Sequence, residues 1–140
     1  MNTIVLTKSL LFSSRPRPSV EPVFNYPLAN CPGKSAIGMR VKFPPGGASP
    51  PHRHGGASVA AVVLEGVVLN KMNDDPMRVV ETGGSWYEAP GCHHKISSNK
   101  SETEPAVIFA TFVVETSVFN EGGYEALVVV DEEYRDIKLV

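Results

Sequence analysis

The chain has 140 residues, enough for one domain with a buried core. Its apolar content of 42% argues against both a disordered and a membrane-spanning chain, and no apolar run reaches the roughly 18 residues that a spanning helix needs. A net charge of -2 gives no basic surface for nucleic acid, so we expect neither nucleic acid nor membrane among its partners.

Residues 1–35 are predicted to be an N-terminal strand and a proline-rich arm of the same domain. The apolar residues 3–6 favour an opening strand, with 9–12 as a second candidate. Residues 13–33 lack periodicity and are expected to lie extended, because proline restricts its own backbone and that of the preceding residue. This segment is expected to be either an arm that wraps the domain or reaches a partner subunit, or a mobile tail. Phe24, Tyr26 and Leu28 favour the docked arm.

The N-terminus does not look like a signal peptide. Lys8 interrupts the apolar part, and no small-residue cleavage site follows before the prolines at 16 and 18. The two cysteines, Cys31 and Cys92, are too few for a disulfide framework. We therefore expect a cytoplasmic protein with free thiols.

The rest of the chain is predicted to be all-β. Twelve glycines and twelve prolines separate short apolar runs, and no long helical periodicity is present. Residues 36–43 alternate, with Ile37, Met39, Val41 and Phe43 on one face. Residues 97–105 are expected to be a loop and 131–136 a helical turn. Further strands are predicted at 58–64, 67–72, 77–81, 85–88, 93–97, 106–115, 124–130 and 137–140.

All four histidines fall in two short segments, at 52–54 and 93–94. His52 and His54 point the same way if their segment is extended, because side chains alternate along a strand. Imidazole is the commonest side-chain metal ligand, so such a pair can fill two corners of a coordination sphere. The alternative is four unrelated loop histidines.

The segments from Gly46 to His54 and from Gly84 to His94, with the glycine turn at Glu65-Gly66 between them, resemble the two motifs of the cupin superfamily. The resemblance extends over roughly residues 36–116. It implies an antiparallel double-stranded β-helix, or jelly-roll barrel, over residues 36–140, preceded by the extended arm. It also implies one divalent ion inside the barrel and a homodimer.

One position departs from the family pattern. The glutamate that should follow His54 by four or five residues is replaced by Ser58 and Val59. The resemblance therefore carries over His52, His54 and His94 as metal ligands without that carboxylate. The identity of the divalent ion is left open among Zn, Fe, Mn, Ni and Cu.

Other side chains near these motifs are candidates for the site. Glu88 is the predicted catalytic residue, as a general base or a fourth ligand, and an outer-face glutamate is the alternative. Trp86 shares its parity and would wall a pocket or pack in the core, whereas Tyr87 should face away. His93 is an alternative ligand to His94. Ser58 shares parity with the histidines and would bond a metal-bound water or be a plain strand serine.

Three neighbours are given other roles. Arg53 should point away from the histidine face, to solvent or a salt bridge. Cys92 is expected to be a small buried filler rather than a soft ligand, and Asn99 a loop residue.

These features favour a metal-dependent enzyme acting on a carbonyl-bearing small molecule. An ion with an open position would support isomerisation, dehydration or cyclisation, as in an isomerase or a lyase. A largely apolar interior would suit aromatic or polyketide-like substrates. The alternatives are an Fe(II) dioxygenase and a non-catalytic ligand-binding cupin. The expected interior residues are Met39, Val41, Val62, Leu64 and Trp86.

Overall fold

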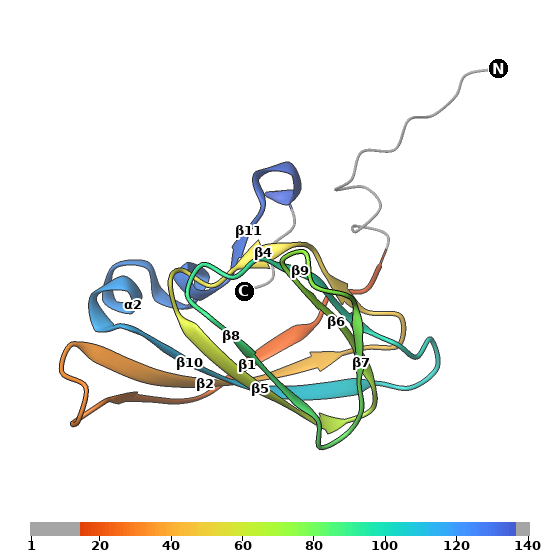
Figure 1. Ribbon diagram of the computed structural model, residues 1–140, viewed down its shortest axis with the longest axis horizontal. Helices are drawn as coiled ribbons and strands as arrows, with labels where there is room; N and C mark the ends of the chain where they lie inside the picture. Colours follow the sequence, from red (N-terminus) through yellow and green to blue (C-terminus); the bar gives the residue numbers. More distant parts are fainter. Residues whose placement is uncertain (1–14, 137–140) are drawn as a thin grey trace.

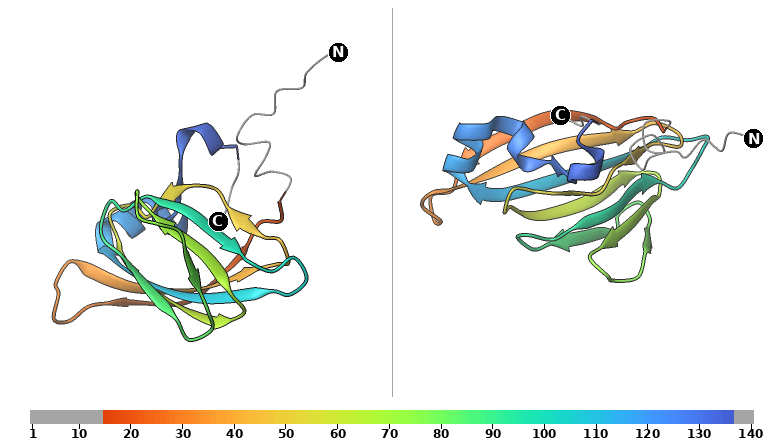
Figure 2. Two further views of the ribbon diagram at one scale, coloured as in Figure 1. Left: turned by 45° about the vertical axis from the view of Figure 1, so that its right-hand side comes forward. Right: turned by 90° about the horizontal axis from the view of Figure 1, so that it is seen from above.

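The structure is a computed structural model that describes residues 15–136. The strands predicted at 3–6, 9–12 and 137–140 lie outside the described residues. Two antiparallel sheets face each other and enclose the core, which confirms the predicted double-stranded β-helix (Figures 1 and 2). The first sheet has the order β1 (Ser19–Pro27), β2 (Lys34–Phe43), β10 (Ala106–Glu115), β5 (Ser58–Glu65), β8 (Ser85–Glu88). The second has the order β11 (Val129–Val130), β4 (His52–Arg53), β9 (His94–Asn99), β6 (Val68–Met72), β7 (Arg78–Val80), with β3 (Ala48–Ser49) also on β9.

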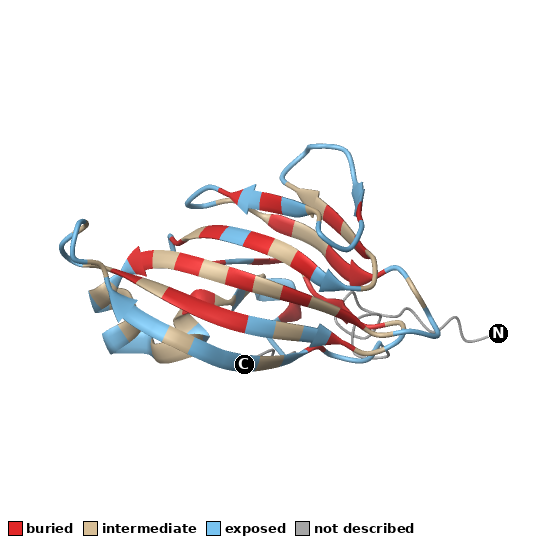
Figure 3. Cartoon of the chain, turned by 90° about the horizontal axis from the view of Figure 1, so that it is seen from below, coloured by how far each residue is buried: buried red, intermediate tan, exposed pale blue. Residues whose placement is uncertain are grey.

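The first sheet supplies most of the apolar core. Buried residues alternate with more accessible ones along β10 and much of β2, as period-two packing of one sheet face requires (Figure 3). Ile37, Met39 and Phe43 are buried on β2 as predicted, and Val41 is packed against them. The inner face of the second sheet is more polar, and the site is formed there.

Two glycine turns carry the chain from one sheet to the other. Gly66, between β5 and β6, has φ 77, and a side chain there would lie 2.6 Å from the carbonyl oxygen of Pro105. Gly91, between β8 and β9, has φ 81. The second turn places the end of β8 opposite the start of β9, which brings Glu88 near His94.

Part of the predicted arm is a strand. β1 pairs with β2 along its whole length, with a bulge between Pro22 and Phe24. Its prolines are tolerated because an edge strand leaves half of its backbone groups outside the ladder. The Phe24 ring covers Gly38 on the outer face, where any side chain at Gly38 would collide with it.

The strand predicted at 124–130 is wrong except for its last residues. After β10 the chain forms α2 (Thr116–Gly122) and η1 (Gly123–Leu127), and only β11 is extended. Apolar side chains of this segment, including Phe119, Tyr124 and Leu127, pack on the core, and that packing outweighs the local strand preference. The helical turn predicted nearby is present as η2 (Glu132–Tyr134).

The predicted loop at 97–105 begins later than expected. β9 continues to Asn99, which is buried and donates hydrogen bonds to the carbonyls of Pro44 and Glu104. Asn99 is therefore a strand residue that ties two loops together, not a loop residue. Among the described helices, none has the length and apolar character needed to cross a membrane.

Candidate metal centre

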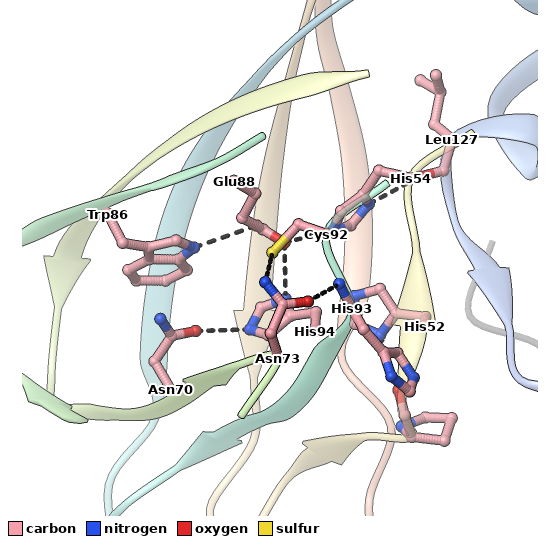
Figure 4. Close-up of polar contacts among 11 residues, drawn as sticks. His52, His54, Asn70, Asn73, Trp86, Glu88, Cys92, His93, His94 and Leu127 are labelled. Atoms are coloured by element: carbon pink, nitrogen blue, oxygen red, sulfur yellow. Dashed lines mark hydrogen bonds and ion pairs between the residues drawn. The ribbon is translucent and has the colours of Figure 1, made fainter. Parts of the chain in front are cut away.

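The three histidines predicted as ligands lie together inside the barrel. His52 and His54 come from β4 and the residue after it, and His52 is the cross-strand partner of His94 on β9. All three are buried, and one ring nitrogen from each lies within 4.8 Å of those of the other two (Figure 4).

The hydrogen bonds of the rings determine which nitrogen faces the centre. Nδ1 of His52 donates to the carbonyl of Pro50 at 2.7 Å, and Nδ1 of His54 donates to the carbonyl of Leu127 at 2.8 Å. A carbonyl only accepts, so Nδ1 carries a proton in both rings, and Nε2 is the nitrogen whose lone pair a neutral ring offers to a metal. His94 has the opposite arrangement, because its Nε2 lies 2.5 Å from Oδ1 of Asn70 and its Nδ1 is left free.

Glu88 reaches the same point from the first sheet. Its Oε1 lies 3.1 Å from Nε2 of His54 and 3.4 Å from Nδ1 of His94, while Oε2 accepts a hydrogen bond from Trp86 Nε1 at 3.1 Å. The carboxylate is buried, so the outer-face alternative for Glu88 is wrong. The chain thus supplies a carboxylate from β8 although the motif position after His54 has none.

Three of these buried atoms have no hydrogen-bond partner among the described residues: His54 Nε2, His94 Nδ1 and Glu88 Oε1. They are lone-pair acceptors that face one another. With neutral rings, such an arrangement is repulsive, and a metal ion between the atoms removes the repulsion. Imidazole nitrogen and carboxylate oxygen are the donors that Zn and its first-row neighbours accept, so the residues present fit a divalent ion.

Burial and mutual contact set the charge of these groups. Burial lowers the pKa of His94 to about 4 although Glu88 opposes it, and burial together with His94 and His54 lowers the pKa of His52 well below its usual value. Burial raises the pKa of Glu88, but the His54 and His94 rings and the Trp86 N–H outweigh it and lower that pKa to about 2. Near neutral pH, His52 and His94 are therefore unprotonated and Glu88 is ionised, as metal ligands must be.

The structure corrects the predicted register beyond the histidines. Val59, not Ser58, faces the site: Val59 is buried opposite Glu88, and Ser58 hydrogen-bonds the Tyr87 hydroxyl on the outer face. Gly55 and Gly56 have φ 63 and 83, so the chain is not extended there and the parity of the histidines does not continue into β5. Ser58 therefore cannot complete the metal shell.

Two other candidates lie away from the centre. His93 bonds Asp131 at 2.8 Å on the rim, so it is not the ligand in place of His94. Cys92 is half-buried beside Asn73, whose Nδ2 lies 3.4 Å from its sulfur, so it is not a buried filler. Neither cysteine is in a disulfide.

Arg53 and Tyr87 are exposed as predicted, and Arg53 lies 3.8 Å from Asp131. Both side chains therefore point away from the histidines.

The histidines and Glu88 open into a cavity of ≈ 50 Å³. Met39, Val41 and Trp86 line it as predicted. Val62 and Leu64 point outward, because the same shift that turns Val59 inward turns its neighbours on β5 away. Two of the five predicted interior residues therefore lie outside the cavity.

The sequence reasoning missed several residues of the site. Asn70 is buried, and its side-chain oxygen orients the His94 ring. It lies on the same strand face as Val68 and Met72, and a polar residue among these apolar ones could have indicated a site residue. The carbonyl of Leu127 comes from a distant segment and carries no sequence signal. Ser49 and Ser97 also line the cavity.

The comparisons with known proteins agree on the family. The sequence profile described as the cupin domain matches residues 39–114, more than half of the chain. Germin-like protein 3-1 of Oryza sativa subsp. japonica is 34% identical over 90 residues, which are 60% of this chain and 40% of that protein. The chain thus spans well under half the length of this curated relative.

Solved structures share the fold. The Schizosaccharomyces pombe Cnp3 cupin domain matches with a TM-score of 0.58 and 16% identity, covering 84% of this chain and 72% of that chain. An uncharacterised protein with a double-stranded β-helix domain from Klebsiella pneumoniae has a TM-score of 0.56 and 18% identity, covering 71% and 77%. An oxalate oxidase bound to the substrate analogue glycolate has a TM-score of 0.52 and 25% identity, covering 75% and 58%. The chain is a small member of the cupin superfamily.

Proposed function

We propose that this cupin is a metal-dependent enzyme that acts on a small carbonyl-bearing molecule. The ligands are His52 Nε2, His54 Nε2, His94 Nδ1 and Glu88 Oε1. The observation that supports this most is the cluster of three buried histidines and a buried carboxylate, in which His54 Nε2, His94 Nδ1 and Glu88 Oε1 have no hydrogen-bond partner among the described residues. Structural zinc sites usually consist of four closed protein ligands, but here the ligands open into a cavity, which suits a catalytic centre.

An ion held there would polarise a carbonyl oxygen of the substrate. The residues of the chain have defined supporting roles. The Pro50 and Leu127 carbonyls fix the tautomers of His52 and His54, and the Trp86 N–H holds one Glu88 oxygen so that the other points to the histidines. The walls are mainly apolar, which lowers the local dielectric constant and strengthens electrostatic interactions inside.

This arrangement favours isomerisation, dehydration or cyclisation by Lewis-acid catalysis. Glu88 supplies one negative charge and leaves the complex of a divalent ion and three neutral imidazoles with a positive charge. The catalytic role predicted for Glu88 is therefore proposed here to be metal binding, because neither of its oxygens points to solvent.

A second candidate is an oxygen-dependent reaction at a redox-active ion, the dioxygenase alternative. The resemblance to an oxalate oxidase, at 25% identity, supports it. Three histidines and a carboxylate can also hold iron or manganese.

Proton exchange separates these functions. We expect the metal-loaded protein to exchange the protons next to the carbonyl of a small ketone or oxo acid with D2O, followed by NMR, and the EDTA-treated protein not to do so. Metal-dependent oxygen consumption without exchange would favour the second candidate. Neither activity in metal-loaded protein across a panel of small carbonyl compounds would favour a non-catalytic binding role.

A further inference from the structure

Two serines line the metal cavity, and their hydroxyls have no hydrogen-bond partner within residues 15–136. Ser49 on β3 and Ser97 on β9 are cross-strand partners, and both residues are buried. Both line the cavity that contains the histidines. Neither hydroxyl forms a hydrogen bond with the described residues, and neither is sealed from the cavity. Each hydroxyl is therefore open to the cavity and can donate a hydrogen bond to an oxygen of a ligand bound there.

The charges around the cavity limit the net charge that a bound ligand can carry. Among the described residues that line it there is no lysine, arginine or aspartate, and Glu88 is the one carboxylate. A divalent ion with Glu88 and three neutral imidazoles has a net charge of +1. A monoanionic ligand brings that charge to zero. A dianion leaves a negative charge among apolar side chains, with no cation to pair with it.

The volume and the apolar walls of the cavity limit the size and polarity of the part of the ligand that lies away from the metal. The cavity is small, with a volume of ≈ 50 Å³, so it favours a ligand of a few heavy atoms. Away from the histidines, the walls include Met39, Val59, Ile108 and Phe112. These walls suit a short apolar end and not a second ionised group.

From these observations we infer that the cavity binds a short oxo monocarboxylate, with Ser49 and Ser97 donating hydrogen bonds to its oxygen atoms. This inference rests on the proposed function and adds the substrate class. Ser49 and Ser97 are positioning residues that select the ligand. Pyruvate and oxalate form a matched pair of probes, because a methyl group in one replaces a charged oxygen in the other.

The test uses the full chain loaded with Co(II), whose visible absorption reports ligand binding without any turnover. Pyruvate and oxalate are titrated into the wild type, Ser49→Ala, Ser97→Ala and Ser98→Ala. Ser98 is a matched control, because it is the next residue of β9, is equally buried and does not line the cavity. Cobalt retained after desalting shows that oxalate has not extracted the ion.

We expect the wild type to bind pyruvate at least about tenfold more tightly than oxalate, although free Co(II) prefers oxalate. Ser49→Ala and Ser97→Ala should each weaken pyruvate binding about tenfold, with the ligand-free Co(II) spectrum and the control unchanged. Oxalate binding as tight as that of pyruvate, or serine variants that match the wild type, would overturn the inference while the metal centre stands. If the wild type does not take up Co(II), the proposed function fails and the inference fails with it.

Discussion

Oε1 of Glu88 lies 3.1 Å from Nε2 of His54, and neither atom has a hydrogen-bond partner among the described residues. The two residues come from opposite sheets. They are brought together by the turn at Gly91, which ends β8 beside the start of β9, and by the Leu127 carbonyl that holds the His54 ring. The contact places a carboxylate where the cupin motif of this chain lacks one.

The first prediction concerns acid stability of the metal-free protein. In the unfolded chain the histidines take up protons near pH 6.5, whereas in the folded protein the pKa of His94 is about 4 and that of His52 is well below its usual value. Stability is therefore full above about pH 6.5 and falls as the pH decreases toward 4, by about 1.4 kcal/mol per pH unit for each such histidine. Glu88 adds a further loss between its usual 4.5 and about 2.

Urea unfolding of EDTA-treated protein at several pH values between 7 and 4.5 measures this. For His94→Asn, the slope of the unfolding free energy against pH should be smaller than that of the wild type by the equivalent of about one proton. A free energy of unfolding that stays constant over this range would contradict the assigned protonation states.

The second prediction tests the register of β5. Ser58→Glu places its charge on the outer face beside Tyr87, so it should change the unfolding free energy by less than about 0.5 kcal/mol and leave metal retention unchanged. Val59→Glu buries a second carboxylate opposite Glu88 and should cost about 3 kcal/mol or more in metal-free protein. Denaturant unfolding of both variants measures which residue faces the site. The reverse order of destabilisation would show that it is Ser58.

The third prediction separates the two faces of the histidine segment. Arg53→Ala should retain metal like the wild type during a timed EDTA challenge, because the Arg53 side chain is exposed toward Asp131. His52→Ala should lose the ion rapidly. Equal losses in the two variants would mean that the segment does not present its histidines to one side.

The fourth prediction is a homodimer. The outer face of the first sheet carries an aromatic cluster in which Phe24 lies 5.6 Å from Tyr26 and 5.8 Å from Phe109, measured between ring centroids. Tyr26 is 63% exposed, and β1 is an edge strand that has no strand partner on its outer side in the described part of the chain. Light scattering at micromolar concentration should give a dimer, and Tyr26→Lys should shift it toward monomer. A wild-type monomer would contradict the proposal.

Much of the fold follows from the sequence because each motif encodes its local geometry. The strands at 85–88 and 106–115 have the predicted bounds, since alternation and flanking turns define them. The grouping of His52, His54 and His94 follows from strand parity and from the resemblance. These features depend on contacts that are near in sequence or fixed by the family pattern.

The predictions from the sequence are wrong where contacts between distant segments, or glycines with a left-handed backbone, determine the local structure. Parity arguments failed across Gly55 and Gly56, because their left-handed backbone reverses the face that the following residues present. The segment at 124–130 is mostly helical because it packs over the core, which no local pattern records. The sequence allows Glu88 to face either inward or outward, and the pairing of β8 with β5 turns it inward.

The most direct test of the metal centre is the metal content of protein purified without chelator, measured by mass spectrometry for the wild type, Glu88→Gln and the exposed control Glu65→Gln. We expect about one divalent ion per chain in the wild type and the control. Glu88→Gln removes the charge but keeps the shape, so its metal affinity should fall at least about tenfold and its occupancy with it. A wild type without stoichiometric metal, or a Glu88→Gln variant that retains metal as the wild type does, would contradict a centre built from three histidines and Glu88.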